Sequence, residues 1–107
     1  MAGSSSIFAL SPSEEARVAQ LLARVEASAG IVLIRNGKEH TARDAAEFLR
    51  RKCGGRLPGY DNAEQFVREC AAKSSASGEL YRIRLAGETE ARASAEVLGQ
   101  WLAVIPK

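Results

Sequence analysis

The side chains best suited to chemistry lie close together in the segment KSSASGELYRIR, residues 73–84. It holds three hydroxyl groups, on Ser74, Ser75 and Ser77. A serine becomes a nucleophile only when a base lies within hydrogen-bond reach of its oxygen. The segment is therefore consistent with a nucleophile loop, an anion-binding loop, or a simple turn between a helix and a strand.

The sequence offers no convincing base for these serines. His40 is the only histidine, and nothing local directs it towards them. Lys73 directly precedes Ser74, but neighbours in a helix do not face each other, and the S-x-x-K spacing of serine–lysine enzymes is absent. We therefore expect the hydroxyls to bond to carbonyl groups at a helix end and the chain to turn at Gly78. A serine-based hydrolase or transferase that uses the 74–78 loop is the alternative.

Basic residues form a second group. Four lie around the predicted end of the second helix: Arg50, Arg51, Lys52 and Arg56. Cations at this position favour the helix dipole, which predicts a structural role. Arg82 and Arg84 alternate along a predicted strand and so share one sheet face, with Arg35 on a nearby strand. These three arginines predict a surface that binds an anionic ligand or partner.

The composition excludes several classes of protein. The chain has 107 residues, of which 26% are charged, and a net charge of +2, which fits one ordinary globular domain. Its aromatic residues are not interleaved with basic ones as in single-strand binders, so we expect no nucleic acid partner. The sequence has no apolar run long enough for a membrane span and no phosphate-binding glycine motif, and we expect no cofactor.

The two cysteines allow two interpretations. Cys53 and Cys70 are candidates for a disulfide, which would close a loop of about 17 residues and stabilise the fold by about 3 kcal/mol. They are equally well explained as two small buried side chains. The sequence has only one histidine besides these two cysteines, which is too few ligands for a structural zinc site, so we expect no metal.

The periodicity predicts an α+β domain of order α-β-β-α-α-β-α. Ser11 and Pro12 begin a first helix, Asn36-Gly37 joins two strands in a hairpin, and Thr41 caps a second helix. Asp61 with Glu64 marks the start of a third helix. The alternation in 79–85 indicates a third strand, and a last helix covers about 94–104. We therefore expect four helices packed with a small antiparallel sheet of about three strands over residues 11–107. We expect residues 1–10 to form a disordered or vector-derived tail.

Several motifs resemble those of the YfeK-like family of small bacterial exported proteins of unknown function. They are IRNGKEHTARDAAEFLRRK, AEQFVREC, KSSASGELYRIR and the closing WL, in the same order over residues 31–102. Two positions depart from the family pattern: Phe48 stands where many relatives have histidine, and Leu80 where they often have proline. The resemblance implies export, with the periplasm as the expected location and the cytoplasm as the alternative. It implies no established activity.

The matched residues also lead to a structural hypothesis. Arg50 and Glu64 lie on consecutive predicted helices, and we expect them to pair, with the serines and Tyr81 close to this network. The function that follows is a non-enzymatic exported domain that binds a protein or a small anionic ligand of the cell envelope. It would do so through an exposed groove or its arginine-bearing face.

Overall fold

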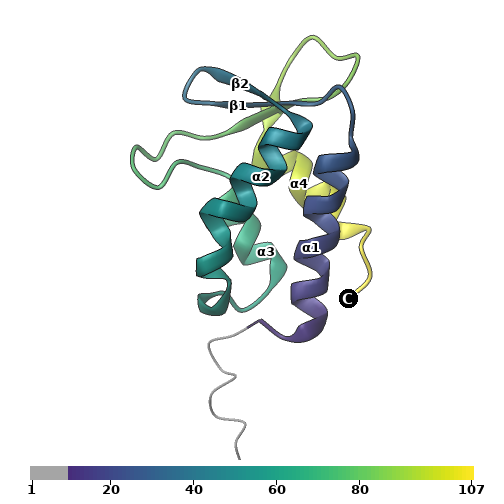
Figure 1. Ribbon diagram of the computed structural model, residues 1–107, viewed down its shortest axis with the longest axis vertical. Helices are drawn as coiled ribbons and strands as arrows, with labels where there is room; N and C mark the ends of the chain where they lie inside the picture. Colours follow the sequence, from purple (N-terminus) through teal and green to yellow (C-terminus); the bar gives the residue numbers. More distant parts are fainter. Residues whose placement is uncertain (1–9) are drawn as a thin grey trace, which may run out of the picture.

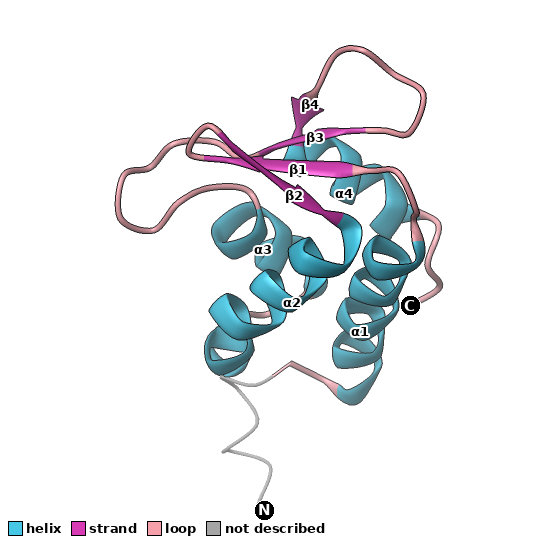
Figure 2. Cartoon of the chain, turned by 45° about the horizontal axis from the view of Figure 1, so that its top comes forward, coloured by secondary structure: helices cyan, strands magenta, loops and turns pink. Residues whose placement is uncertain are grey.

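The structure, a computed structural model, describes residues 10–107 and combines helices with one sheet (Figure 1). Its elements are α1 (Pro12–Ala27), β1 (Val32–Arg35), β2 (Lys38–Thr41), α2 (Ala42–Cys53), the 3-10 segment η2 (Gly54–Gly59), α3 (Ala63–Phe66), the π-helical turn η3 (Val67–Ala71), β3 (Arg82–Arg84), β4 (Arg92–Ala93) and α4 (Ser94–Ala103). The sheet has the order β2-β1-β3-β4, and all neighbouring strands are antiparallel. The helices lie on one side of the sheet (Figure 2). The predicted α+β class is confirmed.

The observed elements differ from the predicted ones in two places. The sheet has a fourth strand, β4, whose two residues pair with Arg82 and Ile83. Two residues are too few to show an alternating pattern, so the sequence gives no signal for this strand. The third helix is divided into α3 and η3, and its N-cap is Asn62 rather than Asp61. The Asn62 Oδ1 atom accepts a hydrogen bond from the Gln65 N–H at 2.8 Å.

Local signals explain the other boundaries. Ser11 Oγ accepts from the Glu14 N–H and Thr41 Oγ1 from the Asp44 N–H, as expected of N-cap residues. In the β1–β2 hairpin, Asn36 has φ of 53° and Gly37 has φ of 78°, the backbone that a tight two-residue turn requires. These short-range interactions fix where α1, α2 and the hairpin begin.

The core lies between the helices and the inner side of the sheet. The apolar stripe of α1 is buried there: Val18, Leu21, Leu22 and Val25. Ala45 and Ala46 of α2 are 1% and 0% exposed, and α1 packs against this helix. Leu10 is 5% exposed and belongs to the same core, while the rest of the predicted tail lies outside the described residues.

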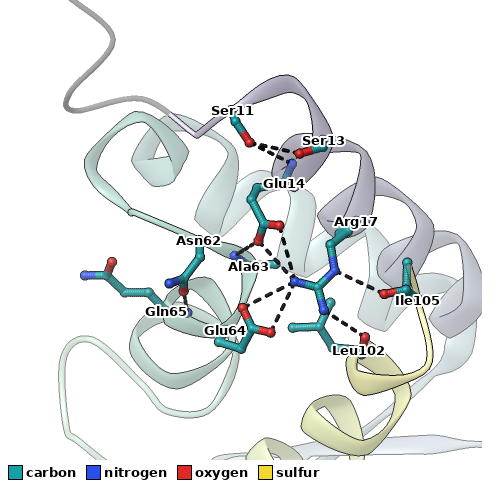
Figure 3. Close-up of polar contacts among 10 residues, drawn as sticks. All are labelled: Ser11, Ser13, Glu14, Arg17, Asn62, Ala63, Glu64, Gln65, Leu102 and Ile105. Carbon is teal, nitrogen blue, oxygen red and sulfur yellow. Dashed lines mark hydrogen bonds and ion pairs between the residues drawn. The ribbon is translucent and has the colours of Figure 1, made fainter. Parts of the chain in front are cut away.

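One charged side chain is buried with the apolar stripe of α1. The guanidinium of Arg17 is 2% exposed, and its Nη1 lies 3.1 Å from Glu14 on the same helix and 3.1 Å from Glu64 on α3 (Figure 3). Its other nitrogens donate to the backbone oxygens of Leu102 at 3.0 Å and Ile105 at 3.3 Å. A buried guanidinium is tolerable only when paired in this way. Arg17 thereby connects α1, α3 and the end of α4.

Glu14 serves two elements at once. Its Oε1 atom accepts from Arg17 and also from the backbone N–H of Ala63 at 2.8 Å (Figure 3). Ala63 is the first residue of α3, so its N–H has no partner within the helix. The carboxylate of α1 therefore supplies a cap to α3.

This network predicts acid sensitivity. Burial alone would raise the pKa of Glu64, but the hydrogen bond from its own backbone N–H and the interactions with Arg17 outweigh it and lower the pKa from 4.5. A lowered folded-state pKa contributes stability above the unfolded value, and this contribution is lost as the pH falls through the folded value. We expect the free energy of unfolding, measured by urea titration, to fall as the pH drops below 4.5.

Glu64→Gln should make that decline less steep, whereas Glu47→Gln should leave it as in the parent chain. Glu47 is a suitable control because its side chain is similarly exposed, 51% against 43% for Glu64. Equal slopes for the parent chain and Glu64→Gln would contradict this assignment.

Candidate functional site

The serine hydroxyls make contacts within and beside their own loop. Ser74 Oγ accepts from the backbone N–H groups of Ala76 and Ser77, both at 3.2 Å. Ser77 Oγ accepts from the Glu79 N–H at 3.2 Å, and Ser75 Oγ accepts from Arg56 Nη1 at 2.9 Å. The sequence predicted bonds to carbonyl groups, and this detail is wrong. The hydroxyl oxygens of Ser74 and Ser77 act as acceptors for N–H groups that the turn leaves unpaired, and that of Ser75 accepts from a side chain.

The carbonyl groups of the preceding helix end have other partners. Lys52 Nζ donates to the oxygens of Cys70, at 2.6 Å, and Lys73. Ser94 Oγ, which is fully buried, donates to the oxygen of Ala71 at 3.0 Å. These donors come from α2 and α4, so the sequence around the helix end could not reveal them.

No base accompanies the serines. Within residues 10–107, no imidazole or amine nitrogen is hydrogen-bonded to Ser74, Ser75 or Ser77. His40 lies on β2, at the edge of the sheet, with its Nε2 atom buried and without a hydrogen-bond partner in this part of the chain. The arrangement therefore provides turn-forming hydroxyls rather than an activated nucleophile.

The predicted pairing of Arg50 with Glu64 does not form. Arg50 Nη1 contacts Glu26 Oε1 of α1 at 2.7 Å, while Glu64 contacts Arg17. The reason is that α1 packs against both α2 and α3. Arg50 of α2 and Glu64 of α3 therefore each pair with a residue of α1. The sequence did contain a signal for Arg17, which lies four residues before Leu21 on the apolar stripe and three after Glu14.

The three arginines of the predicted anionic surface lie on two different faces. Arg82 and Arg84 are opposite Ile34 and Val32 on the open side of the sheet. Arg35 is on the inner side, and its guanidinium lies 4.0 Å above the ring of Phe48 on α2. The alternation of side chains along β1 explains the difference. Leu33 is buried on the inner side of the sheet, and Arg35, two residues further along the strand, points to the same side.

The open side of the sheet forms an outer sheet face of mixed character. It carries Val32, Ile34, Glu39, Arg82 and Arg84. Arg84 contacts Glu39 at 3.3 Å, whereas Arg82 is exposed and forms no ion pair within residues 10–107. Leu80, which precedes the buried Tyr81, is 62% exposed. This face combines one unpaired cation with apolar surface.

A second candidate site is a groove between α1 and α2 with a volume of about 220 Å³. Its lining is mainly apolar and includes Val18, Leu22, Leu49 and Phe66, with Glu15 and Arg50 also present. Arg50, which lines the groove, also forms an ion pair with Glu26. The groove can accept an apolar group but offers few polar atoms to orient it.

A third group, the cation–aromatic cluster, consists of Arg35, Phe48, Lys52, Arg56 and Tyr81. The rings of Phe48 and Tyr81 meet edge to face with centroids 5.8 Å apart, and Lys52 Nζ lies 4.7 Å from the Tyr81 centroid. Burial, then Arg56 and Arg35, lower the pKa of Lys52 to about 8. The sequence predicted Lys52 and Arg56 only as cations that favour the dipole of the second helix. Lys52 lies four residues after Phe48, which was the signal for a shared face of α2, whereas Arg56 lies on η2 and had no such signal.

Among the described residues, no cluster of three or more His, Cys, Asp or Glu side chains is arranged to hold a metal ion. None of the helices in residues 10–107 has the length and apolar character needed to cross a bilayer.

Comparison with known proteins assigns the family. The family of unknown function DUF5329 matches residues 12–104, and the chain belongs to it. The chain is also 35% identical over 68 residues to an uncharacterized protein, YfeK, of Salmonella typhimurium strain LT2. That match covers 64% of this chain and 57% of the relative. No solved structure matches significantly. The YfeK-like resemblance and the relationship to a bacterial protein are therefore confirmed.

The cysteines are bonded to each other, which ties α2 to η3. The Cys53–Cys70 disulfide lies directly beside the hydrogen bond from Lys52 to the Cys70 oxygen, so consecutive residues of α2 hold one residue of η3. Both cysteines are buried, at 1% and 0% exposure.

We expect the double variant Cys53→Ala/Cys70→Ala to lose about 3 kcal/mol of unfolding free energy, because the unfolded chain loses its cross-link. Denaturant titration measures the loss, and the parent chain treated with reductant should match the variant. A thiol assay of the untreated parent chain in denaturant should detect no free thiol. Two free thiols, or equal stability of variant and parent, would contradict the bond.

Proposed function

We propose that this chain is a non-enzymatic binding domain of the bacterial cell envelope that binds an acidic segment of another protein through its outer sheet face. The observation that carries this proposal is the exposed Arg82, which has no ion-pair partner within residues 10–107, together with the exposed Leu80 and the partly exposed Ile34 that pairs with Arg82 in the sheet. A guanidinium binds carboxylates with two parallel hydrogen bonds, and neighbouring apolar surface adds burial. An acidic segment with an apolar residue would satisfy both parts of the face.

The disulfide supports a location outside the cytoplasm. Disulfides persist in oxidising compartments such as the periplasm and are rare where thiols are kept reduced. The Cys53–Cys70 bond is internal, so its role here is to stabilise a small domain.

The serine loop supports a role without catalysis. Each of its hydroxyls accepts a hydrogen bond from the loop backbone or from Arg56, and none is bonded to a base in the described residues. The loop therefore positions the strand that carries Arg82 and Arg84. Its serines contribute to the binding face by fixing that strand.

Capture from an envelope extract followed by calorimetry with the purified partner tests the proposal. The parent chain should bind an acidic protein, and Arg82→Glu/Arg84→Glu should weaken the measured affinity at least about tenfold, because like charges then face each other. Arg51→Glu, on exposed α2 surface, is the matched charge-reversal control and should bind as the parent does. Circular dichroism verifies that each variant is folded. Unchanged affinity of the double variant would exclude this face.

A further inference from the structure

The cation–aromatic cluster, which lies on the inner side of the sheet edge, has features of a ligand site that the outer sheet face does not explain. Arg35, Lys52 and Arg56 reach it from β1, α2 and η2, three separate elements. Arg35 lies over the ring of Phe48, which meets the Tyr81 ring, and Lys52 Nζ lies 4.7 Å from the Tyr81 centroid. Lys52 also donates to the oxygen of Lys73, two residues before the Ser75 that Arg56 contacts. Cations of like charge repel one another, so an anion bound among them would be stabilised by all three.

Arg35 has unused donors. Its guanidinium is stacked on Phe48, its Nε atom is buried without an acceptor, and it forms no ion pair within residues 10–107. A buried N–H group without a partner is unfavourable, and a guanidinium presents its donors in a planar fork. The ring of Phe48 fixes that plane, so the donors are positioned before any ligand arrives.

Lys52 contributes a fixed positive charge. Its amine is held by the oxygens of Cys70 and Lys73 and lies 3.3 Å from the Tyr81 hydroxyl. These bonds hold the charge in place but do not neutralise it. Its pKa of about 8 results from burial first and then from the charges of Arg56 and Arg35, with no carboxylate among the causes.

Arg56 completes the arrangement at the serine loop. Its Nη1 donates to Ser75 Oγ at 2.9 Å, which fixes the guanidinium near the loop while leaving its other donors available. A neutral hydroxyl partner leaves the charge of Arg56 uncompensated. The cluster thus contains three cations and neutral partners only: aromatic rings, hydroxyls and carbonyl oxygens.

We propose that Arg35, Lys52 and Arg56 form a binding site for a doubly charged oxyanion of the phosphate type, either free phosphate or the phosphate group of a larger molecule. The doubly charged anion would accept hydrogen bonds from the two guanidinium groups, while Lys52 would add electrostatic attraction. This site is separate from the outer sheet face, and its test does not depend on the proposed function.

Calorimetric titration with inorganic phosphate at pH about 7 tests the site, with sodium chloride at equal ionic strength as the salt control. The parent chain should bind phosphate. Arg35→Met and Arg56→Met should each weaken binding at least about tenfold, because each removes a charge-assisted hydrogen bond. Arg51 is an exposed cation of α2, the helix that carries Lys52, and Arg51→Met should bind phosphate as the parent chain does. Glycerol phosphate in place of phosphate distinguishes a monoester site, which binds it more tightly, from a free-phosphate site.

The pH dependence provides a second readout. The groups around Lys52 that carry or can gain charge are Arg35 of β1, Arg56 of η2, Lys73 and Tyr81. Phosphate gains its second charge close to neutral pH, so the effect of Lys52 is measured as the affinity of the parent chain relative to Lys52→Met at each pH. Since Lys52 loses its proton as the pH rises through about 8, the parent chain should bind phosphate more tightly than Lys52→Met at pH about 7, and this advantage should shrink at pH about 9. Absence of phosphate binding by the parent chain, or binding by Arg35→Met and Arg56→Met as tight as that of the parent chain, would overturn the proposal.

Discussion

The buried guanidinium of Arg17 is the constraint on which the helical layer depends. A charge that is 2% exposed must have all its donors paired, because an isolated buried ion is strongly unfavourable. Its acceptors come from α1, α3 and the segment that ends α4, namely Glu14, Glu64, Leu102 and Ile105. Arg17 can bond to all four acceptors in only a narrow set of helix positions. It therefore contributes to the specificity of helix packing as well as to the free energy of folding.

A second attachment in the helical layer holds η3 against α2. The disulfide between Cys53 and Cys70 and the bonds of Lys52 hold η3 against α2. The π-helical turn of η3 leaves its carbonyl groups to Lys52 and Ser94, and the serine loop follows directly from it. The loop leads into β3, which completes the sheet beside β1. The sheet lies between the outer sheet face and the cation–aromatic cluster.

The sequence allowed the local features to be predicted, because they depend on neighbours in the chain. The caps at Ser11 and Thr41, the Asn36-Gly37 turn and the shared face of Arg82 and Arg84 all follow from short-range rules. The partners of Arg50 and Glu64 could not be predicted, because they depend on which helices pack together. Arg35 is an intermediate case: its alternation with Leu33 indicated the inner side, but its aromatic partner lies on another element.

The most direct test of this account is the stability of Arg17→Met, compared with Arg43→Met at an ion pair in which Arg43 is 78% exposed. Denaturant titration at neutral pH measures both variants. We expect Arg17→Met to lose about 3 kcal/mol, because it leaves two carboxylates and two backbone oxygens without their donor. Arg43→Met should change stability by no more than about 0.5 kcal/mol. Equal stabilities for the two variants would show that the buried guanidinium does not hold the helices together.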